Sequence, residues 1–169
     1  PDLAPVHNDL PNSRSLKIRS LAEHGFLDDA REALAMLTLE ALRDLPHDRD
    51  YLAVLADLSV AAIAVDSQQH CRCLYDLLRP YANYYAIGIS FHCQGSLAHS
   101  LGNLARALGD APAALTYLCH GVEQNRALGL LPCMLHNQLD LAKLLLARGP
   151  VQDVARARAL LGACAIALL

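Results

Sequence analysis

A short template recurs four times along the chain and limits its fold more than any other feature of the sequence. Each copy has Leu four residues after its first residue and a small or apolar residue three positions further on. Successive copies start about 42 residues apart. The copies are Ala30-Leu34-Leu37, His70-Leu74-Leu77, Ala114-Leu118-Gly121 and Ala157-Leu161-Cys164. Positions i, i+4 and i+7 lie on one face of a helix, so the template predicts a repeated amphipathic helix.

Residues that break helices stand in front of the template at regular distances. Gly25 and Gly109 each lie five residues before the first residue of their copy, and Asp66 and Asp110 each lie four before theirs. A helix placed before each break completes a helix pair, and a single pair cannot bury its apolar face without a neighbour. We therefore expect an all-α fold, a solenoid of about four antiparallel helical hairpins.

The boundaries of about eight helices follow from the Gly, Pro and Asp residues between apolar segments. The expected helices cover residues 13–24, 29–43, 49–65, 68–78, 91–108, 111–128, 131–147 and 151–169. We assign residues 1–12 to a linker or N-terminal arm, and residues 13–169 to one helical domain with repeats at about 13–45, 46–80, 90–129 and 131–169. The aromatic stretch 81–91 is either a hydrophobic patch for a partner or a loop packed on repeats two and three, and we expect the packed loop. Almost no segment alternates as a half-buried strand does, so no strand is expected.

Composition excludes several classes of protein. With 54% hydrophobic residues the chain can form a core, and its net charge of −3 disfavours direct nucleic-acid binding. No apolar run reaches the ~20 residues that span a bilayer, and the start of the chain lacks signal-peptide features. The six Cys fall in expected helices, which is typical of reduced thiols. We expect a cytoplasmic domain without membrane contact and, because the chain begins without Met, a piece of a larger protein.

No motif for catalysis or cofactor binding is present. The sequence has no GxxxxGK[S/T], GxGxxG, HExxH or nucleophile elbow, so we expect no catalytic residue and no cofactor. His70-Cys71-Arg72-Cys73 and the pair Cys133 and His136 are the densest candidates for a metal site. Adjacent helical residues point about 100° apart and cannot chelate together, so we expect buried Cys and no metal. A metal-binding or enzymatic Cys/His domain stays open as an alternative.

Two segments of expected first helices align without gaps, namely Leu101-Gly-Asn-Leu-Ala-Arg-Ala-Leu-Gly109 and Leu141-Ala-Lys-Leu-Leu-Leu-Ala-Arg-Gly149. Their Leu-Gly/Ala…Ala…Leu…small pattern resembles the tetratricopeptide (TPR) repeat, although that family has a shorter period of about 34 residues. Together with Leu74–Tyr81, these segments resemble the C-terminal helical repeats of large bacterial regulators. In those proteins an AAA or STAND ATPase is joined to a LuxR-type DNA-binding domain, as in MalT-like regulators, or to a class III nucleotide cyclase. The resemblance covers residues 45–169.

The resemblance implies a TPR-like α-solenoid that acts as a non-catalytic interaction and regulatory module in a bacterial signalling or transcription protein. Its partner would be a protein, a peptide or a neighbouring domain of the same chain. In TPR-like arrays the first helix of each repeat lines a concave groove. Aligning Gly102 with Ala142 gives the binding positions Ser96, His99, Asn103, Arg106, His136 and Lys143, with Leu139 and Leu146 beside them.

Three of these positions carry the expected chemistry of the groove. Asn103, Arg106 and Lys143 could hold an acidic peptide segment or a carboxylate by charge-assisted hydrogen bonds. One alternative is a small-molecule or peptide sensor with a closed pocket between the same three residues. The other is a solvated polar face that has no dedicated ligand. The run 163–169 is apolar all round, whereas a terminal solenoid helix normally has a polar outer face. We therefore expect a cover for this helix, for instance self-association into a homo-oligomer.

Overall fold

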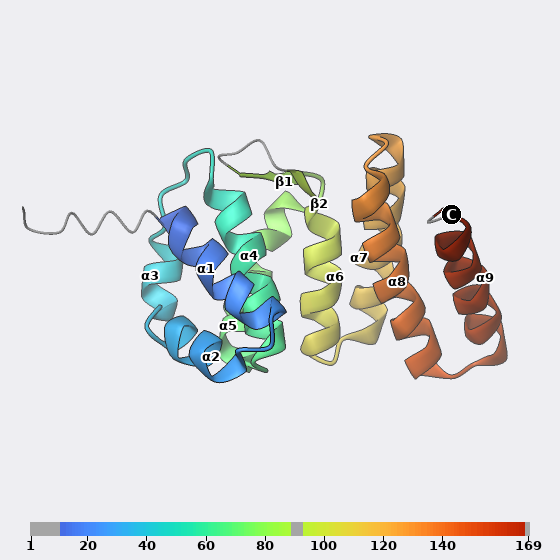
Figure 1. Ribbon diagram of the computed structural model, residues 1–169, viewed down its shortest axis with the longest axis horizontal. Helices are drawn as coiled ribbons and strands as arrows, with labels where there is room; N and C mark the ends of the chain where they lie inside the picture. The colour runs from blue at the N-terminus through green and yellow to red at the C-terminus, as the bar shows by residue number, and fades with distance from the viewer. Residues whose placement is uncertain (1–10, 89–92, 168–169) are drawn as a thin grey trace, which may run out of the picture.

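The computed structural model describes residues 11–88 and 93–167, which form nine α-helices, one 3-10 turn and a two-stranded hairpin (Figure 1). The helices are α1 (Pro11–Glu23), α2 (Leu27–Ala35), α3 (Leu39–Arg43), α4 (Tyr51–Ala64), α5 (Gln68–Leu78), α6 (Leu97–Ala107), α7 (Ala111–Ala127), α8 (Leu131–Arg148) and α9 (Val151–Ala167). The 3-10 turn η1 (Arg79–Tyr81) and strands β1 (Tyr85–Ile87) and β2 (Cys93–Ser96) lie between α5 and α6. The described chain is therefore mostly helical, as predicted. Residues 1–10 of the expected arm lie outside the described residues, and α1 begins two residues before the expected start.

Most of the predicted breaks are helix ends. Helix α1 ends before Gly25, α4 before Asp66, and α6 before Gly109. Asp66 has a φ of 55° and Gly109 a φ of 81°, a left-handed conformation that ends a helix. At the end of α8, the N–H of Gly149 bonds the carbonyl oxygen of Leu145 in the same conformation. These helix boundaries are confirmed within a few residues.

The single helix expected over 29–43 is wrong, because two helices occupy this segment. Helix α2 ends at Ala35 and α3 begins at Leu39. The side chain of Thr38, in an extended conformation, accepts a hydrogen bond of 3.1 Å from the N–H of Ala41 and caps α3. Thr hydroxyls favour such caps over helix interiors, so a local hydrogen bond overrides the apolar pattern here.

The expected helix start at Phe91 and the expected absence of strands are also wrong. β1 and β2 pair in antiparallel fashion, Ala86 opposite Gly95 and Ile87 opposite Cys93, and α6 begins only at Leu97. The shift in register leaves Gln94 as an extra residue on β2, which is a β-bulge. Residues 89–92, with Phe91, lie outside the described residues.

The aromatic side chains before the hairpin pack on the helices, as predicted. The ring of Tyr81 contacts that of Tyr51 at a centroid distance of 6.1 Å, and the Tyr85 hydroxyl donates a hydrogen bond of 3.1 Å to the carbonyl of Gln124. Tyr84 contacts Tyr81 but stays more than half exposed. The hairpin is thereby attached to both α4 and α7.

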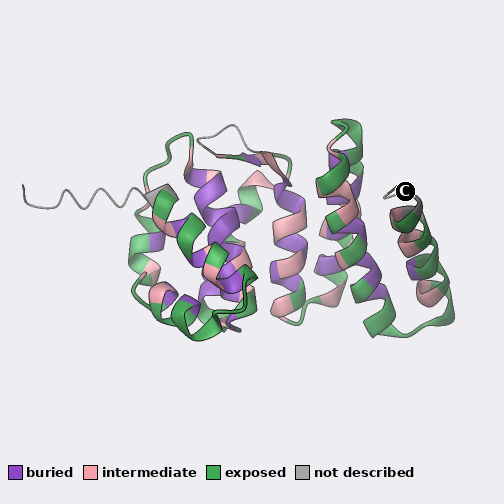
Figure 2. Cartoon of the chain, viewed as in Figure 1, coloured by how far each residue is buried: buried purple, intermediate pink, exposed green. Residues whose placement is uncertain are grey.

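From α4 to α9, helices that are neighbours in the chain pack against each other, whereas α2 packs on α1 and α4, and α3 packs on α5. The buried residues of Figure 2 lie on the facing sides of the helices. The most extensive contacts join α6 to α7, α7 to α8 and α8 to α9, while α1 packs on α4. The buried apolar residues form two clusters that meet at α6. Leu101 and Leu104 belong to the cluster of α1–α6, and Ala105 belongs to the cluster of α7–α9.

Small residues allow close crossings at α7, as the template predicts. A Cβ atom at Gly102 of α6 would lie 2.6 Å from Cγ of Leu118. At Gly121 it would meet the amide of Asn137 and, at 3.0 Å, the backbone nitrogen of His99. Asn137 is fully buried there. In the amide orientation that satisfies both of its neighbours, its nitrogen donates to the carbonyl oxygen of Leu118 and its oxygen accepts from the N–H of Val122. A buried amide thus links α8 to the backbone of α7.

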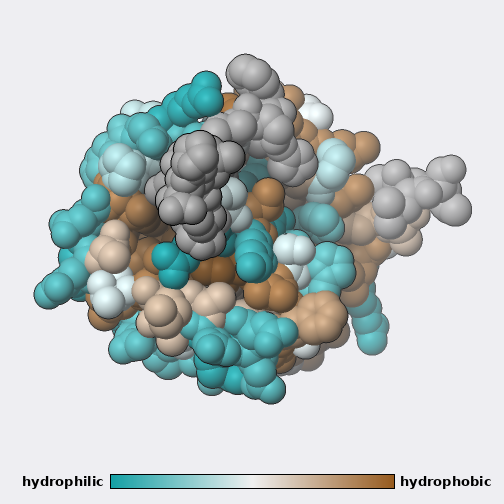
Figure 3. All heavy atoms as spheres, turned by 60° about the vertical axis from the view of Figure 1, so that its left-hand side comes forward, coloured by the Kyte–Doolittle hydropathy of each residue, from teal (hydrophilic) through white to brown (hydrophobic). Residues whose placement is uncertain are grey.

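Helices α1–α3 lie at one end of the molecule, and α9 lies at the other (Figure 1). The face of the N-terminal helices in Figure 3 mixes hydrophilic and hydrophobic patches. Helix α9 packs on α8 through the fully buried Ala157. The side chains of residues 163 and 166–169 lie outside the described residues, so the expected self-association stays a prediction. No helix in the described part of the chain is long and apolar enough to cross a bilayer.

Candidate functional site

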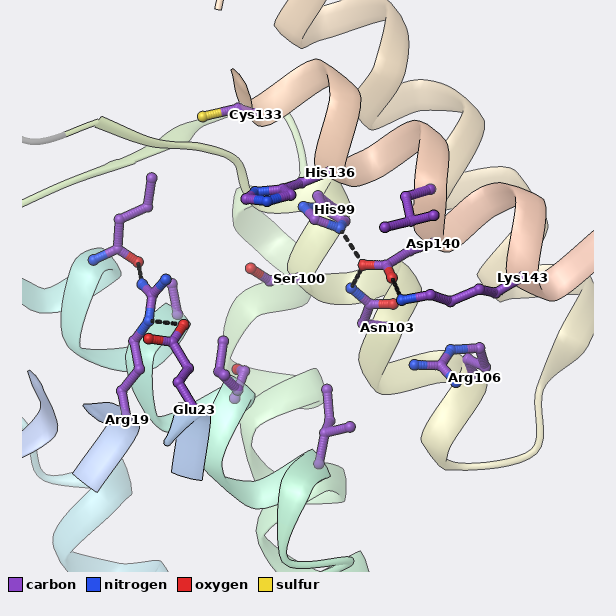
Figure 4. Close-up of a pocket in the computed structure, with 16 residues that line it drawn as sticks. Arg19, Glu23, His99, Ser100, Asn103, Arg106, Cys133, His136, Asp140 and Lys143 are labelled. Atoms are coloured by element: carbon purple, nitrogen blue, oxygen red, sulfur yellow. Dashed lines mark hydrogen bonds and ion pairs between the residues drawn. The ribbon is translucent and has the colours of Figure 1, made fainter. Parts of the chain in front are cut away.

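A cleft of about 470 Å³ lies between two walls of helices (Figure 4). Helices α1 and α4 form one wall, and α6 and α8 form the other. These are the helices that the sequence predicts as the first helices of the four repeats. Val60, Ile63 and Leu139 supply apolar lining, and most of the other lining side chains are polar.

Five of the six predicted binding residues lie on the second wall. His99, Asn103 and Arg106 project from α6, and His136 and Lys143 project from α8. The spacing of three or four residues on each helix explains their common face. The predicted neighbour Leu139 lines the cleft as well, whereas Leu146 is exposed on α8 outside the lining.

Ser96 is not at the cleft, so its predicted place in the groove is wrong. It is buried, and its side chain accepts a hydrogen bond of 3.1 Å from the N–H of Ala98 as the N-cap of α6. Its hydroxyl also donates to Oε1 of Gln124. Because α6 starts six residues later than predicted, the position expected inside a helix became its cap.

Asp140 of α8 joins the predicted donors of the second wall. Its Oδ2 accepts hydrogen bonds from Nε2 of His99 at 2.8 Å and from Nδ2 of Asn103 at 2.9 Å. Its Oδ1 accepts a bond of 3.0 Å from Nζ of Lys143. Burial favours the neutral acid, but the hydrogen bonds from His99, Asn103 and Lys143, with the electrostatic effect of His99, outweigh it and hold the pKa of Asp140 well below its usual range. Asp140 is therefore an ionised carboxylate at the centre of this wall.

Sequence reasoning missed Asp140, although its position carried a signal. It lies four residues after His136 and three before Lys143, on the same helical face as these predicted residues. Two of the three donors expected to meet a ligand carboxylate, Asn103 and Lys143, thus already bind a carboxylate of the chain itself.

Two polar groups of the second wall remain without a partner in the described part of the chain. Arg106 is exposed, and its guanidinium makes no hydrogen bond or ion pair with a described residue. Oδ1 of Asn103 is buried and likewise accepts no hydrogen bond there. An unpaired buried acceptor is unfavourable, so a donor group entering the cleft would be stabilised at this oxygen.

The opposite wall is held by an ion pair that sequence reasoning did not find. Nη1 of Arg19 donates to Oδ1 of Asp57 at 3.0 Å and to Oε1 of Gln94 at 3.0 Å, and its Nε bonds Glu23 at 2.8 Å. The bulge in β2 gives Gln94 the orientation for this contact. Ser15 donates a further bond of 3.2 Å to Asp57.

Burial dominates the electrostatics of this pair. The Asp57 side chain is 1% exposed, and desolvation raises its pKa even though Arg19, Ser15 and Gln94 lower it. Desolvation acts to lower the pKa of Arg19, but its bonds to Glu23 and Asp57 leave that pKa raised. Arg19 and Asp57 therefore fix α1 against α4 and shape the cleft, which is a structural role.

His70, Cys71 and Cys73 lie buried in α5, outside the cleft. His70 contacts the Ser67 hydroxyl at 2.7 Å and the Leu37 carbonyl at 3.0 Å. Burial, with a smaller effect of Asp66, raises the pKa of Cys71 to about 11, and burial also raises the pKa of Cys73. Raised values are the opposite of an activated nucleophile. In the described residues, no group of three or more His, Cys, Asp or Glu could hold a metal ion.

Comparison with protein-family models, with curated proteins and with solved structures finds no match to this chain. The chemistry of the cleft must therefore be argued from its own residues. Of the three cations that line it, Arg19 is paired with Glu23 and Asp57, and Lys143 with Asp140, so Arg106 is the cation without an ion pair among the described residues. The cleft can hold an anionic group next to an apolar one.

Proposed function

We propose that this chain is a non-catalytic interaction module, a TPR-like α-solenoid whose cleft binds an acidic segment of a partner protein or of a neighbouring domain. The order of contacts supports the solenoid, because α5 packs on both α4 and α6, and α7 packs on both α6 and α8. The cleft supports it too, because α1, α4, α6 and α8 line it at the first-helix position of each repeat.

The observation that carries the binding proposal is Arg106. It is an exposed cation in the cleft without an ion pair to any described residue, next to the unpaired acceptor oxygen of Asn103. Lys143 shares Asp140 and keeps more than half of its side chain exposed. An acidic side chain can pair with Arg106, a backbone N–H can bond Asn103, and an apolar side chain can pack on Leu139.

Several residues that line the cleft are exposed to solvent, which favours an extended segment over a small enclosed ligand. Arg106, His136, Leu139 and Lys143 all lie in the lining and are all exposed, so a chain can enter and leave across them. We expect affinity to fall with salt, because the pairing involves exposed charges.

The test is fluorescence anisotropy with labelled peptides that alternate Glu or Asp with Leu, compared with the same peptides carrying Lys in place of the acids. We expect the acidic set to bind and Arg106→Ala to weaken binding roughly 10- to 100-fold, the loss of one charge-assisted bond. Arg72→Ala is the matched control, because Arg72 is exposed on α5 outside the cleft lining. Equal binding of both peptide sets, or equal losses in the two variants, would contradict the proposal.

A second candidate is a sensor for small carboxylates, which the three donors around Asp140 favour. If Asp140 occupies a ligand position, Asp140→Ala should bind acetate or glutarate more tightly than the wild type in isothermal titration calorimetry. Absence of heat with either compound in both proteins would remove this candidate.

We also propose that the module lies in the cytoplasm, within a bacterial regulator that contains an AAA or STAND ATPase. The support is the Leu, Ala and Gly pattern of residues 101–109 and 141–149, and the helix pairs that these segments begin. The sequence that flanks this chain in its gene tests the proposal, because it should encode a P-loop ATPase. A secreted or unrelated enzymatic context would contradict it.

A further inference from the structure

Two Cys residues from distant parts of the chain lie against each other beside the cleft. Cys93 is in β2, and Cys133 is in the first turn of α8. The thiol of Cys133 donates to the carbonyl oxygen of Cys93 at a distance of 3.8 Å. Figure 4 shows its sulfur directed from α8 toward the strands. Both residues are partly exposed, so solvent and small oxidants can reach them.

The backbone between the two residues is fixed by close packing. Gly95 has a φ of +93°, and a Cβ atom there would lie 2.8 Å from Cβ of Cys133. β2 therefore approaches α8 more closely than a residue with a side chain would allow. The N–H of Ser96 donates a 2.9 Å bond to Oδ1 of the buried Asn125, which holds the strand against α7. The short separation of the two Cys residues is thus built into the fold.

The other four Cys residues have different surroundings. Cys71 and Cys73 are buried in α5. Cys119 contacts Nη2 of Arg156 at 3.2 Å, and Cys164 lies 3.5 Å from Oε1 of Gln138. Among the described contacts, only Cys133 bonds to another Cys residue.

We propose that Cys93 and Cys133 form a reversible disulfide that covalently ties β2 to α8 at the edge of the cleft. The oxidant is a low-molecular-weight disulfide such as oxidised glutathione. One Cys thiolate attacks a glutathione sulfur, forms a mixed disulfide and releases one glutathione thiolate. The second Cys thiolate then attacks the protein sulfur of the mixed disulfide and releases the other. The protein loses two electrons and two protons, and one glutathione disulfide becomes two thiols.

Two consequences follow from the position of the pair. Burial, together with the neighbouring Cys93, raises the pKa of Cys133, so its thiolate is scarce at neutral pH and the bond should form faster as the pH rises. Cys133 itself lines the cleft, so the bond would fix the distance between the hairpin and the wall formed by α8.

The test uses the full chain in buffers of reduced and oxidised glutathione, with peptide mapping and counting of free thiols. We expect one cross-linked pair containing Cys93 and Cys133, and two fewer free thiols. Cys93→Ser and Cys133→Ser should each abolish this cross-link, and Cys119→Ser is the matched control that should keep it. Circular dichroism of each variant shows whether its helices are intact.

A parallel reaction in urea keeps the proposal falsifiable even if a variant fails to fold. Unfolded chains should give a mixture of pairings, because six Cys residues then compete. A Cys93–Cys133 bond that forms as readily in urea as in the folded chain would overturn the proposal. Glutathione adducts without a cross-link in the folded wild type would overturn it as well.

Discussion

The ion pair between Arg19 and Asp57 provides the sharpest test of how the cleft is held together. Arg19→Met keeps most of the aliphatic stem and removes the guanidinium. Asp57, 1% exposed, would then keep Ser15 and Gln94 as polar neighbours but would have no cation beside it among the partners named above. Removing one partner of a buried pair costs about 3–5 kcal/mol, because the remaining charge is neither solvated nor paired.

This magnitude converts into a measurable shift in urea denaturation followed by circular dichroism. With a denaturant dependence of about 2 kcal/mol per molar urea, the midpoint should fall by roughly 1.5–2.5 M. Glu23→Gln is the matched control, since it removes the other ion pair of Arg19. Glu23 is 45% exposed and stands four residues along the same helix, so its loss should cost less than about 0.5 kcal/mol.

The loss of stability in Arg19→Met, relative to the wild type, should also depend on pH. Arg19 lowers the pKa of Asp57, so its removal raises further a folded-state pKa that burial has already raised. Above the unfolded-state value of about 4, the folded variant then keeps a proton that the unfolded chain has lost. Its free energy of unfolding therefore falls as the pH rises through this window, and the deficit should be smaller at pH 5 than at pH 7.

Two results would refute this reasoning. One is a loss below about 1 kcal/mol at pH 7, the size of an exposed ion pair. The other is a deficit that is independent of pH. Adding Asp57→Asn to Arg19→Met should recover much of the loss, because neither partner is then charged.

The other predictions concern packing, the carboxylate of the cleft and the cap of α6. Gly102→Ala should lower stability by about 1–3 kcal/mol in urea denaturation, because its Cβ would lie 3.0 Å from the Leu118 backbone nitrogen; a gain would contradict the close crossing. Gly162→Ala, whose Cβ would meet no described atom within 4 Å, should instead gain up to about 1 kcal/mol. Asp140 stabilises the fold above its unfolded pKa of about 4, and this contribution is lost as the pH falls below that value. In Asp140→Asn the free energy of unfolding should therefore fall less than in the wild type as the pH drops from 6 to 2. An equal fall in both proteins would argue against an ionised carboxylate. Ser96→Ala should lower the thermal midpoint through a loss of about 1 kcal/mol, and no change would mean that the cap is dispensable.

Helix ends set by glycine were predictable, and so was the start of α7, which Asp110 caps, but the cap at Thr38 was not. Gly25 and Gly109 adopt positive φ, a preference written into the residue itself. Thr38 starts α3 within a segment expected to be one helix, because its hydroxyl accepts a hydrogen bond from the N–H of Ala41. The hairpin was missed because its strands are three and four residues long, too short for an alternating pattern to be recognised.

The candidate site was predictable on one wall only. Helical spacing and the alignment of two repeats place His99, Asn103 and Lys143 on a common face, and the structure brings them together. Asp140 shares that face but was not considered as their internal partner. The wall with Arg19 was missed because its contacts join residues 38 and 75 positions apart in the sequence, which helical periodicity does not relate.

The division of the core at α6 bears on how a ligand would act. Helices α1 and α4 belong to one apolar cluster and α8 to the other, so the two walls of the cleft stand on different cores. A ligand that touches both walls binds only when both cores are folded, and it stabilises them jointly. With the ligand bound, the two cores would then unfold together in one cooperative transition. The backbone amide protons of α8 and α9 would exchange with solvent at the same rate as those of α4.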